Sequence, residues 1–101
     1  MESYDKLVRD RIPEILSEKG ILYEQRVASD EEYKIELIKK LNEEALEFSL
    51  AGNPEELADV LEVIEALRQL PEYSRVVELQ EKKREERGAF SKRLILKGQK
   101  G

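Results

Sequence analysis

Four carboxylates in the middle of the chain occupy positions where a helical protein normally places apolar side chains. They form two pairs with a spacing of three residues, Glu44 with Glu47 and Glu56 with Asp59. At about 100° per residue, Glu44 lies inside the apolar stripe of its predicted helix and Glu47 lies at the border. Glu56 and Asp59 lie inside and near the edge of the apolar arc of the next predicted helix. Because buried carboxylates repel one another and cost several kcal/mol when unpaired, the pattern predicts that the four bind a divalent cation.

The residue types that the chain lacks narrow the choice of metal. There is no Cys and no His, which excludes thiolate and imidazole ligands and the usual general base. Oxygen ligands alone favour hard cations, with Mg²⁺ or Mn²⁺ as the first candidates. Glu43 adjoins the predicted ligands but falls well outside the apolar stripe.

Plainer explanations exist for single members of this set. Charged residues make up 41% of the chain, so Glu43 taken alone is as well explained by a solvated helix face. The run Asn53-Pro54-Glu55-Glu56 is a typical helix start, in which Asn53 caps the helix and Glu56 reaches back to it. For Glu56 alone, capping and metal binding are equally supported. The four residues together favour the metal site, because chance would scatter them around the helices.

Two helices with a tight turn between them are predicted to position the carboxylates. Apolar residues recur every three or four positions on both sides of the breaker Ala51-Gly52-Asn53-Pro54, which predicts antiparallel neighbours. Ser29-Asp30-Glu31-Glu32 is a capping box, so the first helix is expected to run from about Asp30 to Ala51. Pro71 is expected to close the second.

The flanking segments predict shorter elements. These are a short helix over about residues 10–19, a strand at 21–27, a helix from 72 or 74 to 87, and a strand at 92–97. Gly20 and Gly88 are expected to stop the two helices, and the two strands would pair. The predicted fold is mainly α, an antiparallel helical bundle in a single domain over residues 1–101, with at most one small two-stranded sheet.

The distribution of charge indicates the class of partner. Residues 31–72 carry 4 basic and 12 acidic side chains, whereas residues 73–101 carry 9 and 4. An acidic centre beside a basic tail suits a small phosphorylated ligand, and simple solubility is the alternative explanation for the tail. A net charge of −5 without a broad basic surface predicts no nucleic-acid polymer as partner. No apolar run exceeds three residues, so neither a membrane span nor a secretory signal is expected, and a cytoplasmic location is the default.

A second apolar strip on the first long helix, Ile35, Leu46 and Leu50, lies opposite the main stripe. A chain of 101 residues builds only a modest core. We therefore expect a partner chain or a terminal segment to cover this far strip, and predict a homodimer or homotetramer.

Three motifs, in order along the chain, resemble those of a known family. Lys6-Leu-Val-Arg-Asp-Arg-Ile-Pro13 is similar to the opening signature of small proteins related to phosphoribosyl-ATP pyrophosphohydrolase, within the MazG-like all-α nucleoside triphosphate pyrophosphatase superfamily. Glu43-Glu44-x-x-Glu47 and Glu56-x-x-Asp59 resemble that superfamily's EExxE and ExxD motifs. Arg87-Gly88-Ala89-Phe90 followed by Lys92-Arg93 resembles the closing RGGF segment, with Ala89 in place of the second glycine. The eight residues between Glu47 and Glu56 are a short spacing for the superfamily.

The resemblance implies Mg²⁺-dependent hydrolysis of a nucleoside triphosphate between the α and β phosphates, which yields a monophosphate and pyrophosphate. Removal of non-standard nucleotides is one role that this activity could serve. Glu43 and Glu44 are then the candidate catalytic residues, and Glu43, next to the ligands but off the apolar stripe, is the candidate to orient or deprotonate water. The candidate phosphate-binding residues are Lys6, Arg9, Arg11, Arg87, Lys92 and Arg93. Surface charge remains the simpler explanation for Lys6 and Lys92.

Two other classes of function stay open. One is a phosphohydrolase dedicated to phosphoribosyl-ATP in histidine biosynthesis, and the other is a helical interaction module that binds a structural cation without catalysis. Turnover restricted to phosphoribosyl-ATP would indicate the first. Mg²⁺ binding without phosphate release from any nucleotide would indicate the second.

Overall fold

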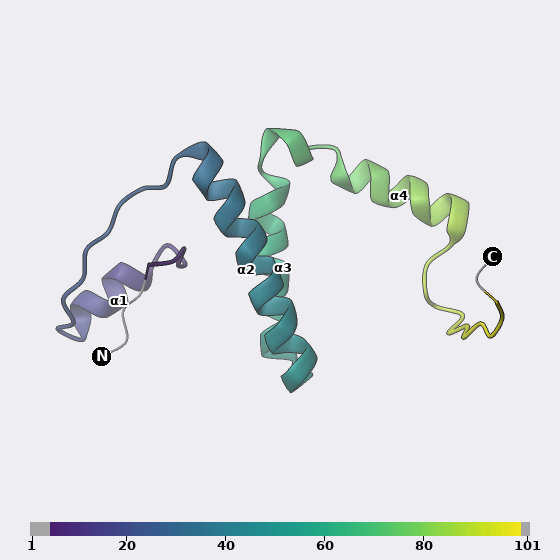
Figure 1. The fold of residues 1–101 in the computed structure, drawn as a ribbon, viewed down its shortest axis with the longest axis horizontal. Coiled ribbons are helices and arrows are strands. Elements are labelled where there is room, and N and C mark those ends of the chain that lie inside the picture. Colours follow the sequence, from purple (N-terminus) through teal and green to yellow (C-terminus); the bar gives the residue numbers. More distant parts are fainter. Residues whose placement is uncertain (1–4, 100–101) are drawn as a thin grey trace.

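The structure is a computed structural model that describes residues 5–99, and it is built from helices (Figure 1). In chain order these are α1 (Ile12–Glu18), α2 (Asp30–Ala51), α3 (Pro54–Arg68), the 3₁₀ turn η1 (Pro71–Tyr73) and α4 (Val76–Arg87). No β-strand occurs between residues 5 and 99. The mainly α character predicted from the sequence is confirmed.

The helices of the α2–α3 hairpin begin and end where local signals in the sequence place them. The Ser29 hydroxyl accepts a hydrogen bond from the Glu32 N–H at 3.2 Å and caps α2. Gly52 ends α2 at a φ of 66°, a left-handed conformation that glycine adopts without steric cost. The Asn53 side chain then accepts from the Glu56 N–H at 2.9 Å and caps α3. The turn is so short that the two helices must lie side by side in opposite directions.

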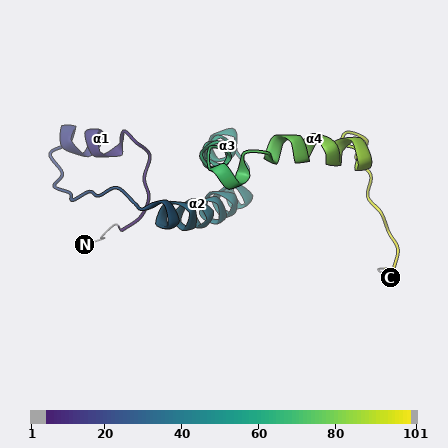
Figure 2. The same cartoon turned by 90° about the horizontal axis from the view of Figure 1, so that it is seen from above.

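The contact between α2 and α3 forms the small core of the chain (Figures 1 and 2). Among residues 5–99, Leu37 of α2 and Val63 of α3 are the buried apolar residues. Each belongs to the stripe that helical periodicity predicts for its helix. The hairpin is therefore the unit that positions the predicted site.

Helices α1 and α4 leave the hairpin on opposite sides instead of packing along it (Figure 2). The molecule measures 56 × 32 × 25 Å, and its Cα radius of gyration is 18.2 Å. A compact domain of this length would have a radius of about 13 Å. A single chain thus forms one helical hairpin, α2–α3, with two extended arms that carry α1 and α4. The predicted helical bundle does not form within one chain.

The predicted pair of short strands is wrong. Residues 21–27 and 92–97 form no strand, and they lie on opposite sides of the hairpin, where neither can supply the other's ladder hydrogen bonds (Figure 1). The first segment instead runs back beside α1, with the Tyr23 hydroxyl 2.8 Å from the Ser17 hydroxyl. Helix α4 also starts later than predicted, at Val76, because the chain first makes the turn η1.

The far strip of α2 is exposed in the chain. Leu46 keeps 59% and Leu50 keeps 81% of its surface accessible, and Ile35 is exposed as well. No terminal segment within residues 5–99 covers these side chains, so their coverage by a partner chain stays a prediction. These exposed apolar side chains are interspersed with charged residues along α2. Within the described range, no helix combines the length and apolar character needed to span a membrane.

The cap at the start of α3 offers a test of the hairpin. Replacing Asn53 by Ala removes the acceptor for the Glu56 N–H. We expect the free energy of unfolding to fall by about 1 kcal/mol. In a domain of this size, that lowers the melting temperature by roughly 4–8 °C. Thermal unfolding followed by circular dichroism measures it. Asn42→Ala, on the exposed surface of α2, is the matched control and should leave the melting temperature unchanged or slightly higher, since Ala favours helix.

Candidate metal centre

Three carboxylates from the two helices of the hairpin converge. One oxygen each of Glu44 on α2 and of Glu56 and Asp59 on α3 lies within 4.8 Å of the other two. Glu56 and Asp59 are one helical turn apart and so share a face of α3. The antiparallel packing of α2 against α3 brings Glu44 opposite that face. These three residues are called the acidic cluster below.

The acidic cluster is short of hydrogen-bond donors. The Oε2 atoms of Glu44 and Glu56 are both buried, and neither accepts a hydrogen bond from the part of the chain that the structure describes. Only 13% of the Glu44 side chain is exposed. A buried acceptor without a donor loses its hydration without compensation, and the cost is larger when the group is charged. A cation bound between the helices would supply the missing partner for both oxygens.

Both of these glutamates hold a proton more tightly than an exposed glutamate does. Burial raises the pKa of the Glu44 carboxyl, and the negative charges of Glu47 and Asp59 raise it further. Burial likewise raises the pKa of the Glu56 carboxyl, and the same two neighbours add to the effect. Negative charge is therefore concentrated beyond what the surroundings compensate, which is the electrostatic condition for binding a cation.

Two cationic side chains border the acidic cluster. Arg9 donates a hydrogen bond from Nη2 to Asp59 Oδ1 at 2.7 Å. The Nζ of Lys40 lies 3.9 Å from Glu44 Oε1. These contacts leave the Oε2 atoms of Glu44 and Glu56 without donors, so the cluster keeps an uncompensated negative charge.

The other two predicted acidic residues lie at the margin of the cluster. Glu47 is exposed and is not one of the three residues whose oxygens lie within 4.8 Å of one another. Its negative charge nevertheless acts on both Glu44 and Glu56. Glu43 is exposed too, and its Oε1 lies 3.7 Å from the Nζ of Lys6. The structure thus brings three of the predicted ligands together, with Glu47 beside them and Glu43 toward the solvent.

The predicted phosphate-binding residues fall into two groups. Lys6 and Arg9 lie at the acidic face of the hairpin, through the ion pairs with Glu43 and Asp59. Arg11 instead pairs with Glu14 within the first turn of α1, its Nε lying 3.1 Å from Oε2. The remaining three lie at the end of α4 and beyond it, on the other side of the hairpin from α1 (Figure 1): Arg87, Lys92 and Arg93. Of these six residues, Arg9 therefore contacts the acidic cluster, and Lys6 lies nearby at Glu43.

The donor set suits a hard divalent cation. It offers carboxylate oxygens alone, and Mg²⁺ in particular uses a few carboxylates while keeping positions for water and substrate phosphates. Exposed acidic groups often cluster without any ion, so the acidity by itself is weak support. The two buried oxygens without donors are the stronger support, because they belong to two of the three carboxylates that converge and nothing among the described residues compensates their burial.

Sequence reasoning missed Lys40 and the partner of Arg9. Lys40 stands four residues before Glu44, a spacing at which side chains on one helix meet, so this contact could have been found. The ion pair of Arg9 with Asp59 joins residues 50 positions apart. No local pattern in the sequence signals such a contact.

The raised pKa values predict how stability depends on pH in the absence of metal. Glu44 and Glu56 bind protons more tightly folded than unfolded, so they add to the free energy of unfolding as pH falls from above their raised pKa values toward the ordinary value of about 4.3. Glu44→Gln removes a carboxylate whose burial nothing compensates, so at pH 7 it should raise the melting temperature by a few degrees. That gain should shrink at pH 5. Thermal unfolding with a chelator present measures it, and a lower melting temperature for Glu44→Gln at pH 7 would contradict the burial of an uncompensated charge.

The chain was also compared with known proteins. No protein-family model, no curated protein and no solved structure matches it.

Proposed function

We propose that this protein is a Mg²⁺-dependent nucleoside triphosphate pyrophosphohydrolase that cleaves between the α and β phosphates and releases a nucleoside monophosphate and pyrophosphate. The observation that carries the proposal is the acidic cluster, where three carboxylates converge and two buried oxygens lack donors. The motifs that hold these residues resemble those of the MazG-like superfamily. Mn²⁺ is the alternative metal. The proposed biological role is the removal of non-standard nucleotides.

Some of the acidic residues would bind the metal, and others would act in catalysis. Glu44, Glu56 and Asp59, with Glu47 beside them, would hold the metal, which when bound supplies charge neutralisation and polarisation of phosphoryl oxygens. Glu43 lies next to Glu44 on the solvent side, where it can orient or deprotonate the attacking water. Glu43 and Glu44 are therefore the proposed catalytic residues.

Two basic residues of the amino-terminal segment would bind the phosphates. Arg9 already lies against the acidic cluster, and its guanidinium fork can exchange Asp59 for the oxygens of a phosphate. Lys6 lies beside Glu43 at the same face and adds a second positive charge. In the single chain, the other proposed phosphate-binding residues lie away from the cluster: Arg11, Arg87, Lys92 and Arg93. Their participation would need a rearrangement of the arms or a second chain.

The proposal includes a homodimer or homotetramer in the cytoplasm. Its partner is a small nucleotide, with no nucleic-acid polymer and no membrane. The exposed apolar surface of the hairpin supports assembly, because a single chain leaves large apolar side chains such as Leu46, Leu50 and Leu61 accessible to water.

A panel of ordinary and modified nucleoside triphosphates, incubated with Mg²⁺ and the protein, tests the proposal. We expect pyrophosphate rather than single phosphate as the product, and no reaction with a chelator present. Turnover of phosphoribosyl-ATP alone would instead assign the protein to histidine biosynthesis. Stabilisation by Mg²⁺ without turnover of any nucleotide would instead indicate a metal-binding interaction module without catalytic activity.

A further inference from the structure

The amino-terminal arm, residues 5–29, meets the hairpin at its acidic residues. In Figure 1 the segment before α1 turns back toward the hairpin. There Arg9 donates a hydrogen bond from Nη2 to Asp59 Oδ1 of α3 at 2.7 Å. The Nζ of Lys6 lies 3.7 Å from Glu43 Oε1 of α2. The arm therefore contacts both helices of the hairpin, and it does so with cationic side chains.

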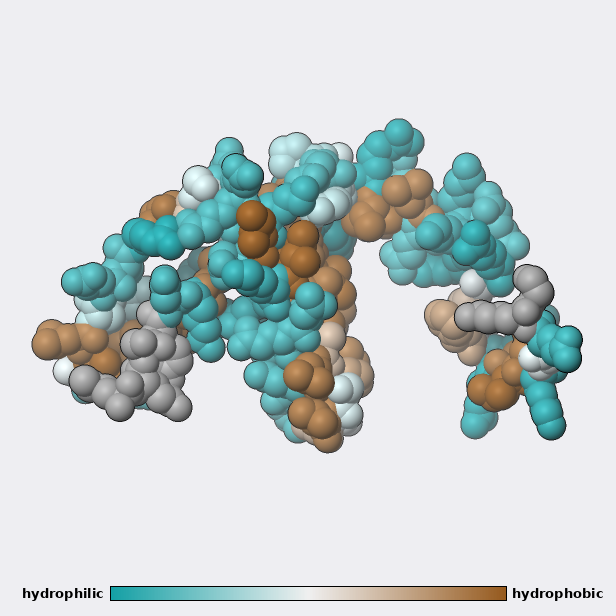
Figure 3. Space-filling model, in the orientation of Figure 1, coloured by the Kyte–Doolittle hydropathy of each residue, from teal (hydrophilic) through white to brown (hydrophobic). Residues whose placement is uncertain are grey.

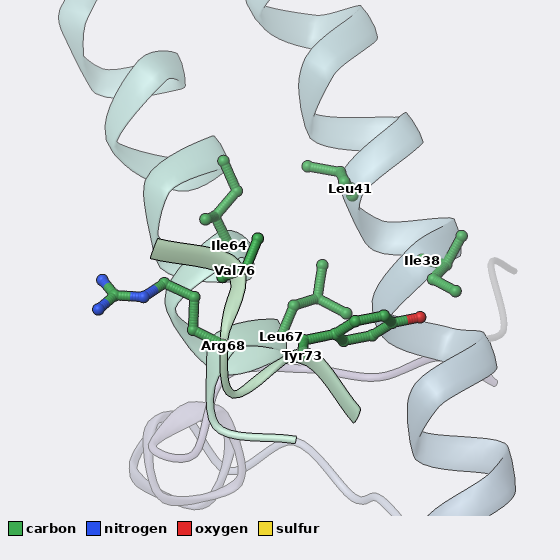
Figure 4. Close-up of a pocket in the computed structure, with 7 residues that line it drawn as sticks. All are labelled: Ile38, Leu41, Ile64, Leu67, Arg68, Tyr73 and Val76. Atoms are coloured by element: carbon green, nitrogen blue, oxygen red, sulfur yellow. The ribbon is translucent and has the colours of Figure 1, made fainter. Parts of the chain in front are cut away.

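Apolar packing contributes little to this contact. No residue between 5 and 29 is buried, and large apolar side chains of the arm lie at the surface, with Leu22 and Val27 97% exposed (Figure 3). The hairpin has an apolar groove of about 290 Å³, but side chains of α2, α3, η1 and α4 line it, such as Leu41 and Ile64, and residues 5–29 supply none (Figure 4). Charge is therefore the main force that holds the arm on the hairpin.

Arg9 and a metal ion would bind to the same carboxylates. Asp59, the partner of Arg9, is one of the three residues whose oxygens converge within 4.8 Å. A divalent cation among them lowers the negative potential that holds the Arg9 guanidinium, and the guanidinium lowers the potential that holds the cation. Because coupling between two binding events is reciprocal, each weakens the other by the same factor.

The contact between Arg9 and Asp59 is weak enough for one cation to shift it. The two side chains keep 57% and 40% of their surface exposed, and exposed ion pairs contribute little to stability, because water and salt screen the charges. Arg9 also leaves the acidic cluster unsatisfied. Glu44 and Glu56 each keep a buried oxygen without a donor among the described residues. A divalent cation would therefore gain more from the cluster than Arg9 does.

We propose that the amino-terminal arm is a metal-responsive strap. When no cation is bound, Arg9 holds the arm on Asp59. When a divalent cation is bound by the acidic cluster, that contact loosens, and the guanidinium becomes free to bind the phosphate oxygens of a substrate. Phosphate binding by Arg9 thus follows metal loading. The inference rests on the metal site of the proposed function and adds a means of regulating it.

Metal affinity in the absence of nucleotide tests the coupling. Calorimetric titration with Mg²⁺ compares the wild type with Arg9→Gln, which removes the charge and keeps a polar side chain. We expect Arg9→Gln to bind Mg²⁺ about three- to tenfold more tightly, the scale of one charge near a divalent ion in an exposed site. The gain should shrink in high salt. Arg11→Gln is the matched control, because Arg11 pairs with Glu14 within α1, and its Mg²⁺ affinity should equal that of the wild type.

The position of the arm is measured as the distance between two spin labels, since the chain has no cysteine of its own. Labels at Glu18→Cys in α1 and Glu62→Cys in α3, both exposed positions, report distances within one chain when labelled protein is diluted with unlabelled protein. We expect a narrow distance distribution with a chelator and a broader one with saturating Mg²⁺. Addition of Arg9→Gln should give the broader distribution already with the chelator.

Two results would overturn the strap and leave the proposed metal site intact. One is unchanged or weaker Mg²⁺ binding by Arg9→Gln, which would mean that Arg9 either does not act on the metal or orients Asp59 for it. The other is a distance distribution that saturating Mg²⁺ does not alter. If the wild type binds no Mg²⁺ in the titration, the proposed metal site itself is wrong, and the strap with it.

Discussion

Under the proposed function, we expect nucleotide turnover to fall by about 100-fold or more when Glu44 or Glu56 is replaced by Gln, or Asp59 by Asn. Each amide keeps the size of the side chain but removes one negative charge from the acidic cluster. The remaining carboxylates would then hold Mg²⁺ more weakly and position it less well for the phosphates, and phosphoryl transfer depends on such positioning and on charge. We expect turnover to fall for Glu47→Gln as well, because the negative charge of Glu47 acts on both Glu44 and Glu56.

The same variants should lose the stability that Mg²⁺ confers. A ligand present at a hundred times its dissociation constant stabilises the folded state by about 2.7 kcal/mol, so the wild-type melting temperature should rise with Mg²⁺ and that of the variants should rise much less. This measurement separates a lost metal site from a lost fold.

Two glutamates of α3 provide matched controls. Glu62→Gln and Glu65→Gln make the same chemical change on the same helix, at exposed positions outside the acidic cluster. Glu65 loses a surface ion pair with Arg68, which is worth at most about 1 kcal/mol. Both variants should keep wild-type turnover and metal response. If they behave like the cluster variants, the assignment of the site to this face of the hairpin fails.

The rate should depend on free Mg²⁺ with an apparent order above one, even when all nucleotide is already complexed. Glu47 and the acidic cluster contribute four negative charges, and an ionised triphosphate adds about four more. Lys6, Arg9 and a single Mg²⁺ would leave about −4 at the reacting centre, which Coulomb repulsion in a partly dry site strongly disfavours. A second or third ion brings the site near neutrality, as in two-metal phosphoryl transfer.

Initial rates measured against free Mg²⁺, at fixed and saturating Mg²⁺-nucleotide, check this expectation. Arg9→Lys keeps the positive charge but loses the planar fork, so it should weaken substrate binding and leave the metal order unchanged. A rate that saturates at one equivalent of metal per site, beyond the nucleotide's own, would exclude the multi-ion mechanism.

The sequence predicted the hairpin well because its signals are local. Ser29 and Asn53 cap their helices as their types predict, Gly52 adopts the left-handed conformation expected at a helix end, and the predicted bounds of α2 match the observed ones. Helical periodicity then placed Glu44, Glu56 and Asp59 on facing sides, and these are the residues that the structure brings together.

Contacts between distant segments could not be predicted in the same way. The proposed strand at 21–27 required a partner more than sixty residues away, and nothing in its alternation of side chains specifies where that partner lies. The contact of Arg9 with Asp59 depends on how the amino-terminal arm returns to the hairpin, which no periodicity encodes. Glu32 shows the same limit on a small scale, because its carboxylate binds Arg26 in a bidentate pair, Nη2 to Oε2 at 2.7 Å, instead of completing the predicted capping box.

The tight turn at Gly52 has a consequence for how the protein folds. All members of the acidic cluster lie within residues 44–59, so they come together through contacts that are short in sequence, and such contacts form on the microsecond to millisecond scale. Association of two chains is a slower step that depends on concentration. The hairpin should therefore fold first, and in the proposed assembly the complete cluster would be open to a cation before two chains associate.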